Sequence, residues 1–153
     1  MQTDSIQLRE LTVRYSVKKT DAGESLVVGR ALKSARESAE LLMRVLADEP
    51  AEVFAMLCLS TKHRVIAFHE VSRGTLDSTL VHPREVFKAA LLANAAAIVV
   101  SHNHPSGDPS PTIDDLDVTT RLVAAGEILG IPVLDHIVVG DGRYFSFKEA
   151  GRL

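Results

Sequence analysis

Apolar residues recur along the chain with two periods, one typical of helices and one typical of strands. Positions three and four apart predict a helix over 35–48, which Ser34 caps and Pro50 follows. Cap and stop signals predict two more helices, over 83–93 and 113–129. Short apolar runs predict five strands, over 52–59, 64–71, 95–100, 133–139 and 144–147.

The connections between these elements indicate the fold class. Polar residues 60–63 join the first two strands, and Asp141 with Gly142 joins the last two, as expected of hairpins. The run 95–100 lies between helices, which predicts a buried central strand. Because helices alternate with strands and hairpins are also present, we expect an α/β (α+β) fold in which helices pack on a mixed sheet.

Three segments carry weaker signals. Alternation over 7–15 is compatible with a strand, and the polar stretch 18–25 predicts a loop or arm. Segment 101–111 contains three prolines and a glycine, so we expect no regular structure there. We therefore divide the chain into an N-terminal arm or peripheral segment, 1–34, and one domain, 35–153.

Composition narrows the class of protein further. With 153 residues, 46% hydrophobic and 24% charged, the chain can bury a core, which argues against disorder. A net charge of −3 gives no general attraction to phosphate backbones, so charge does not support a nucleic-acid partner. The absence of a signal sequence and of a long apolar run predicts a cytoplasmic protein without a membrane partner. The single cysteine, Cys58, excludes an internal disulfide and is expected to be buried.

One group of residues suggests chemistry. His102 and His104 lie two apart at a strand end, so their imidazoles can point to the same side. Asp115 falls in the first turn of the following helix, and two imidazoles with one carboxylate are a common catalytic zinc ligand set. The alternative is structural, since the histidines can be ordinary loop residues and Thr112 with Asp115 matches a helix cap.

This spacing resembles a known motif. The motif consists of His-x-His-Pro, then a Ser or Thr after seven residues from the second His, then an Asp after two more. This pattern is similar to the JAMM (MPN-plus) metalloprotease motif. The sequence of residues 102–107 resembles the RadC branch of that superfamily. Further RadC-like stretches occur in the same order, at 73–78, 82–86 and 133–140. The resemblance covers 35–153 and implies an MPN/JAB-like domain, with a three-layer, cytidine-deaminase-like arrangement of a mixed sheet and helices.

The resemblance also implies roles for individual residues. The zinc ligands would be His102, His104 and Asp115, and the cofactor Zn²⁺. The catalytic glutamate would be Glu52, at the start of an early strand, with Glu70 and Glu85 as alternatives.

Thr112 stands where the family has a catalytic serine, and it keeps the hydroxyl while adding a methyl group. His136 is interpreted as a core histidine or one that supports the ligands, and Asp135 as a group that could orient a ligand imidazole.

The function that follows is hydrolysis of a peptide or isopeptide bond by water at a zinc ion. Two alternatives stay open. One is a DNA-repair or DNA-processing accessory protein, and the other is a catalytically silent MPN interaction module. The expected partner is a peptide or protein substrate, and a homodimer is compatible with the sequence.

Overall fold

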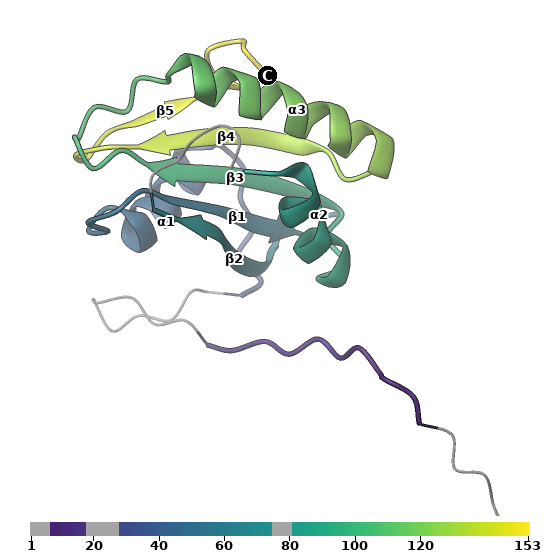
Figure 1. Ribbon diagram of the computed structural model, residues 1–153. Coiled ribbons are helices and arrows are strands. Elements are labelled where there is room, and N and C mark those ends of the chain that lie inside the picture. Colours follow the sequence, from purple (N-terminus) through teal and green to yellow (C-terminus); the bar gives the residue numbers. More distant parts are fainter. Residues whose placement is uncertain (1–6, 18–27, 75–80) are drawn as a thin grey trace, which may run out of the picture.

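The computed structural model describes residues 7–17, 28–74 and 81–153 (Figure 1). All three predicted helices and all five predicted strands are present in this part of the chain, with ends that differ by at most three residues. In order, they are α1 (Ala35–Leu46), β1 (Val53–Leu59), β2 (Val65–Arg73), α2 (Pro83–Leu92), β3 (Ala97–Asn103), α3 (Ile113–Leu129), β4 (Val133–Val139) and β5 (Tyr144–Ser146).

The strands form one mixed sheet in the order β2-β1-β3-β4-β5. β3 and β4 are parallel, and the other neighbouring pairs are antiparallel. Helices α2 and α3 cover one face and α1 covers the other, as Figure 1 shows. The predicted mixed sheet between helix layers is therefore confirmed.

Alternation along the central strands divides the core into two halves. Every residue of β1 and of β3 is buried. Phe54 and Cys58 of β1 pack toward α2 and α3, whereas Ala55 and Leu57 pack toward α1. Cys58 is buried as predicted, and burial raises the pKa of its thiol to about 11.

The structure corrects two expectations. β3 continues through Ser101 and His102 to Asn103, so the irregular segment is shorter than predicted. The ladder with β1 extends to His102 and the ladder with β4 extends to Asn103, because the first proline, Pro105, comes only after these residues. The strand suggested for 7–15 is wrong, because residues 7–17 contain neither helix nor strand.

Residues 18–25, predicted as a loop or arm, lie outside the described residues. The division of the chain between 34 and 35 stays a prediction.

Local capping residues determine where α1 begins and where α3 ends. Ser34 Oγ accepts the N–H of Glu37 at the start of α1, as its position predicted. Gly130 ends α3 in the left-handed conformation, with φ of 70°. These local signals explain why the predicted helix starts agree with the structure.

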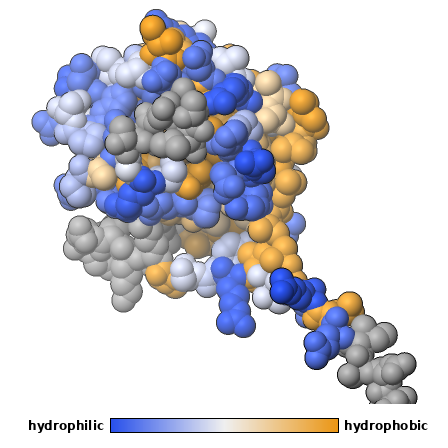
Figure 2. All heavy atoms as spheres, in the orientation of Figure 1, coloured by the Kyte–Doolittle hydropathy of each residue, from blue (hydrophilic) through white to orange (hydrophobic). Residues whose placement is uncertain are grey.

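The visible surface is largely polar (Figure 2). Apolar residues gather along the right-hand margin of this view, where α2 and α3 end. The exposed apolar side chains at these two helix ends are Leu91, Leu92, Ile128 and Leu129. No helix in the described ranges is long and apolar enough to cross a membrane. The apolar margin lies at the opposite end of the sheet from His102 and His104, which lie at the end of β3.

Candidate metal centre

Two histidines and one aspartate converge where β3 ends and α3 begins. His102 is the penultimate residue of β3, His104 follows the strand, and Asp115 lies in the first turn of α3. The two Nε2 atoms are 3.0 Å apart. Asp115 Oδ1 is 3.1 Å from His102 Nε2, and Asp115 Oδ2 is 3.4 Å from His104 Nε2. The structure thus brings all three sequence-predicted donors together.

These distances fit a metal ion with tetrahedral coordination. Zinc binds nitrogen and oxygen at about 2.0–2.1 Å, which places neighbouring ligand atoms about 3.3 Å apart. The two imidazole nitrogens lie 3.0 Å apart, and each has an oxygen of Asp115 within 3.1 to 3.4 Å, Oδ1 for His102 and Oδ2 for His104, which is close to that spacing. The three residues are a group that could hold a metal ion. Imidazole with carboxylate suits zinc, and it also accepts iron or manganese.

The loop after β3 orients His104. Its Nδ1 lies 2.7 Å from the backbone carbonyl of Asp108. A carbonyl oxygen only accepts hydrogen bonds, so Nδ1 donates to it, and Nε2 is the nitrogen of His104 that faces Asp115. The N–H of His104 also donates to Val139 O at 2.9 Å, which attaches the loop to β4.

His136 lies directly behind His102. It is fully buried, and its Nε2 is 2.9 Å from His102 Nδ1. Its ring stacks on Phe147 at 4.8 Å and meets Phe54 edge-on at 5.6 Å. His136 is therefore a core histidine that contacts a candidate ligand, and both interpretations of it from the sequence stay compatible with the structure.

The corresponding expectation for Asp135 is wrong. Its carboxylate accepts hydrogen bonds from Ser146 Oγ at 2.6 Å and from the N–H of Lys148 at 3.0 Å. It therefore connects β4 to the C-terminal turn and does not reach a ligand imidazole, because alternation along β4 turns it to the face opposite His136. Burial raises the pKa of this carboxyl group above its usual value, although its hydrogen bonds oppose the shift.

The environment of the cluster favours an anionic Asp115. Burial alone would raise the pKa of Asp115, but hydrogen bonds to His102 and His104 outweigh it and hold that pKa well below its usual range. The bond to Asp115 raises the pKa of His104, and the charge of Glu52 adds to the rise. Burial lowers the pKa of His136 well below its usual value, so that ring is neutral.

Glu52 is placed next to this cluster by the strand register. Phe54 of β1 is opposite His102 of β3, and the N–H of Val53 donates to Asn103 Oδ1 at 2.7 Å. Extending that antiparallel register by two residues puts Glu52 opposite His104, on the same face as Phe54.

The two alternative glutamates have other partners. Glu70 on β2 accepts from Arg73 Nε at 2.6 Å, and it pairs with Ala55, whose side chain faces α1. Glu85 on α2 forms an ion pair with Lys88 at 2.7 Å.

Thr112 is the N-cap of α3. Its hydroxyl accepts the N–H of Asp115 at 3.2 Å, and its own N–H donates to Asp115 Oδ2 at 2.8 Å. This reciprocal capping box confirms the structural interpretation of the pair. It also holds the Asp115 carboxylate toward the histidines, so cap and ligand geometry are compatible.

Two residues near the cluster carried no recognisable signal. Asn103, between the histidines, is buried and donates to the carbonyls of Ala51 and Glu49 at 3.0 and 3.3 Å. Thr119, one turn after Asp115, contacts His136 Nδ1 at 2.6 Å. Their roles depend on partners far away in sequence, which spacing alone does not reveal.

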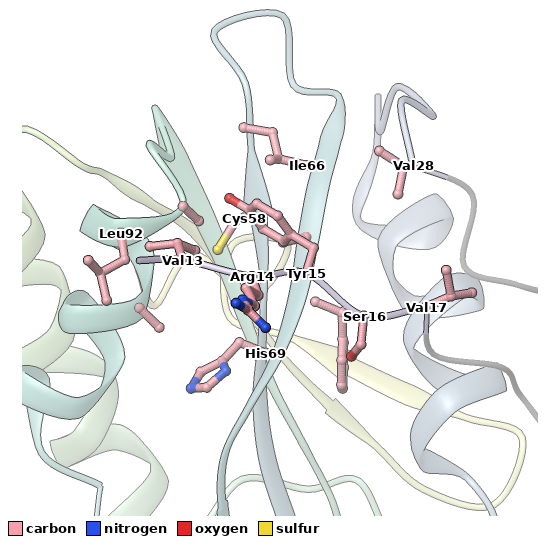
Figure 3. A pocket seen from close by; sticks show the side chains of 14 residues that line it. Val13, Arg14, Tyr15, Ser16, Val17, Val28, Cys58, Ile66, His69 and Leu92 are labelled. Atoms are coloured by element: carbon pink, nitrogen blue, oxygen red, sulfur yellow. The ribbon is translucent and has the colours of Figure 1, made fainter. Parts of the chain in front are cut away.

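A separate cavity of about 910 Å³ lies against β1, β2 and α2 (Figure 3). Its walls include Cys58, Ile66 and Leu92, and the backbone segment carrying Val13 and Tyr15 crosses it. None of the three candidate donors lines it, so it does not belong to the metal centre.

A mixed sheet between helix layers, with two imidazoles and a carboxylate at the end of a central strand, defines an α/β domain with a candidate single-ion metal site. The chain belongs to the RadC-like JAB domain family, which matches residues 32–152. The resemblance inferred from the motif is thereby confirmed.

The chain is also similar in sequence to several curated proteins. The chain is 48% identical over 118 residues to a UPF0758 protein of Alkaliphilus oremlandii, covering 77% of this chain and 51% of the relative. It is 44% identical over 144 residues to a UPF0758 protein of Desulfitobacterium hafniense, covering 94% and 63%. For a UPF0758 protein of Methanosarcina barkeri the identity is 45% over 122 residues, covering 80% and 53%. The chain thus spans about half to three fifths of the relatives it matches.

Proposed function

We propose that this chain is a zinc-dependent hydrolase that uses water to cleave an amide bond, either peptide or isopeptide. One observation chiefly supports the proposal: two imidazoles and one carboxylate converge as a group that could hold a metal ion, and Glu52 is near enough for its charge to act on His104. A structural metal site normally has four protein ligands, whereas three leave a position for a reacting molecule.

Zinc held by His102, His104 and Asp115 would lower the pKa of water and polarise the scissile carbonyl. Glu52 accepts a proton from the attacking water and passes it to the leaving amine nitrogen. Thr112 donates its hydroxyl proton to the carbonyl oxygen as negative charge develops there. Its contact with the N–H of Asp115 uses the oxygen as an acceptor, which leaves that proton for the substrate.

The exposure of the donors suggests where a substrate enters. The side chain of His102 is 2% exposed, whereas those of His104 and Asp115 are each 12% exposed. His102 is therefore the most deeply buried of the three, and His104 and Asp115 are the more accessible donors. A peptide or protein segment would approach from the side of His104 and Asp115, and we propose a peptide or protein substrate.

The test compares Glu52→Gln with Glu70→Gln in zinc-loaded protein, using a library of fluorogenic peptides and isopeptides. We expect Glu52→Gln to lower turnover by about 10²–10⁴-fold while zinc content stays the same, and Glu70→Gln to leave turnover close to wild type. Chelation should abolish hydrolysis, and added zinc should restore it. Turnover that survives Glu52→Gln or chelation would refute this assignment.

The other two functions are outcomes of the same test. If the protein holds zinc but hydrolyses no member of the library, the result would favour a catalytically silent interaction module. Salt-sensitive DNA binding, which would weaken steeply as salt rises, would favour a DNA-processing role.

A further inference from the structure

A line of polar groups runs from the donor cluster into the core between the sheet and α3. His102 Nδ1 lies 2.9 Å from His136 Nε2, and His136 Nδ1 lies 2.6 Å from Thr119 Oγ1. Thr119 Oγ1 in turn lies 2.7 Å from the backbone carbonyl of Asp115. The line therefore starts at one candidate ligand and ends at the backbone of another.

The direction of each hydrogen bond follows from counting protons. The carbonyl of Asp115 can only accept, so the single hydroxyl proton of Thr119 is donated to it. Thr119 Oγ1 must then accept from His136, which places the proton of His136 on Nδ1. With the proton of His136 on Nδ1, its Nε2 carries the lone pair, and His102 Nδ1 donates to it. With Nδ1 directed to His136, Nε2 is the nitrogen of His102 that faces Asp115 and His104.

The members of the line are shielded from solvent. Thr119 is 2% exposed, His102 is 1% exposed and His136 is fully buried. The rings of Phe54 and Phe147 cover His136. A buried imidazole without its hydrogen-bond partner is costly, so each member of the line depends on the next.

We infer that Thr119 and His136 are positioning residues that hold His102 in the Nδ1–H tautomer, so that its Nε2 lone pair is available to a metal ion. The inference rests on the metal centre proposed above, and it assigns a function to two residues outside the ligand set. In the alternative order, Thr119 donates to His136 and His136 donates to His102. The proton of His102 would then lie on Nε2, where it would oppose metal binding.

The first experiment reads the tautomer without any metal. Long-range ¹H–¹⁵N NMR of the metal-free protein, with histidines labelled, should show His136 protonated at Nδ1 and not at Nε2. A proton on His136 Nε2 would overturn the inference, whether or not the protein binds zinc. The expected tautomer together with no zinc binding by the wild type would instead count against the proposed function alone.

The second experiment compares two substitutions of one side chain. Thr119→Val keeps the shape of the side chain but removes the hydroxyl, whereas Thr119→Ser keeps the hydroxyl. We expect Thr119→Val to weaken zinc binding by about 10- to 100-fold, measured by competition with a chromophoric chelator, and Thr119→Ser to keep wild-type affinity. Equal affinity in the two variants would overturn the inference.

A third variant covers the case in which Thr119→Val does not fold. His136→Phe keeps an aromatic ring against Phe147 but has no nitrogen to accept from His102. Zinc affinity should fall to a similar extent, and the Co²⁺-loaded protein should show an altered ligand-field spectrum. Wild-type affinity and an unchanged spectrum would contradict the positioning role of His136.

Discussion

The carboxamide of Asn103 joins the strand that carries the histidines to the segment that carries Glu52. It accepts from the N–H of Val53 at 2.7 Å and donates to the carbonyls of Ala51 and Glu49 at 3.0 and 3.3 Å. The residue is 3% exposed, so water cannot easily replace these partners. Asn103→Ala should therefore leave at least one buried donor, the N–H of Val53, without an acceptor.

The size of the effect follows from those three bonds. An orphaned buried donor costs about 1–3 kcal/mol, and each lost hydrogen bond about 0.5–1.5 kcal/mol. We expect Asn103→Ala to lower the free energy of unfolding by about 2–4 kcal/mol, with Tm falling by roughly 5–15 °C. The assay is urea unfolding followed by circular dichroism, with the slope against denaturant compared to confirm that only stability changed.

Two further variants make this test specific. Asn103→Asp keeps the acceptor for Val53 but turns an oxygen toward two carbonyls, so it should also destabilise the protein. Lys62→Ala, in the exposed β1–β2 turn, should change stability by no more than about 0.5 kcal/mol. An Asn103→Ala protein within about 1 kcal/mol of wild type would refute the argument that these bonds hold the two segments together.

Two predictions concern the ligand loop. A Cβ atom at Gly140 would lie 2.3 Å from Gly107 O, so Gly140→Ala should push the loop away. We expect the free energy of unfolding in urea to fall by about 1–3 kcal/mol and zinc binding to weaken. Unchanged stability and zinc affinity would contradict this prediction. The second is a pH dependence. Because hydrogen bonding to Asp115 raises the pKa of His104 above 6.5, protons compete with the metal at His104 as the pH falls, and zinc affinity should begin to decline above pH 6.5. Zinc titrations between pH 8 and 5.5 measure this, and an affinity that is constant down to pH 6 would contradict it.

Local signals account for what the sequence predicted well. Thr112 and Asp115 form a cap that depends only on residues three apart, and His102 with His104 needs only a strand end. The helix starts at Ser34 and Thr112 follow from the same kind of short-range chemistry.

The remaining features depend on contacts between distant residues. His102 meets His136 across 34 positions, Asn103 meets Val53 across 50, and Thr119 meets His136 across 17. Such contacts follow from sheet order and register, which residue spacing does not encode. The same reason explains why β3 is longer than its apolar run: its last residues are held by β1 and β4 and not by their own propensity.

The central claim is that His102, His104 and Asp115 hold a metal ion, and metal content tests it most directly. Protein prepared without a histidine tag should contain about one zinc per chain by mass spectrometry. Asp115→Ala should lose it, whereas Asp114→Ala, the exposed neighbour in the same helical turn, should keep it. No zinc in the wild type after zinc is supplied, or equal zinc in the two variants, would contradict the account.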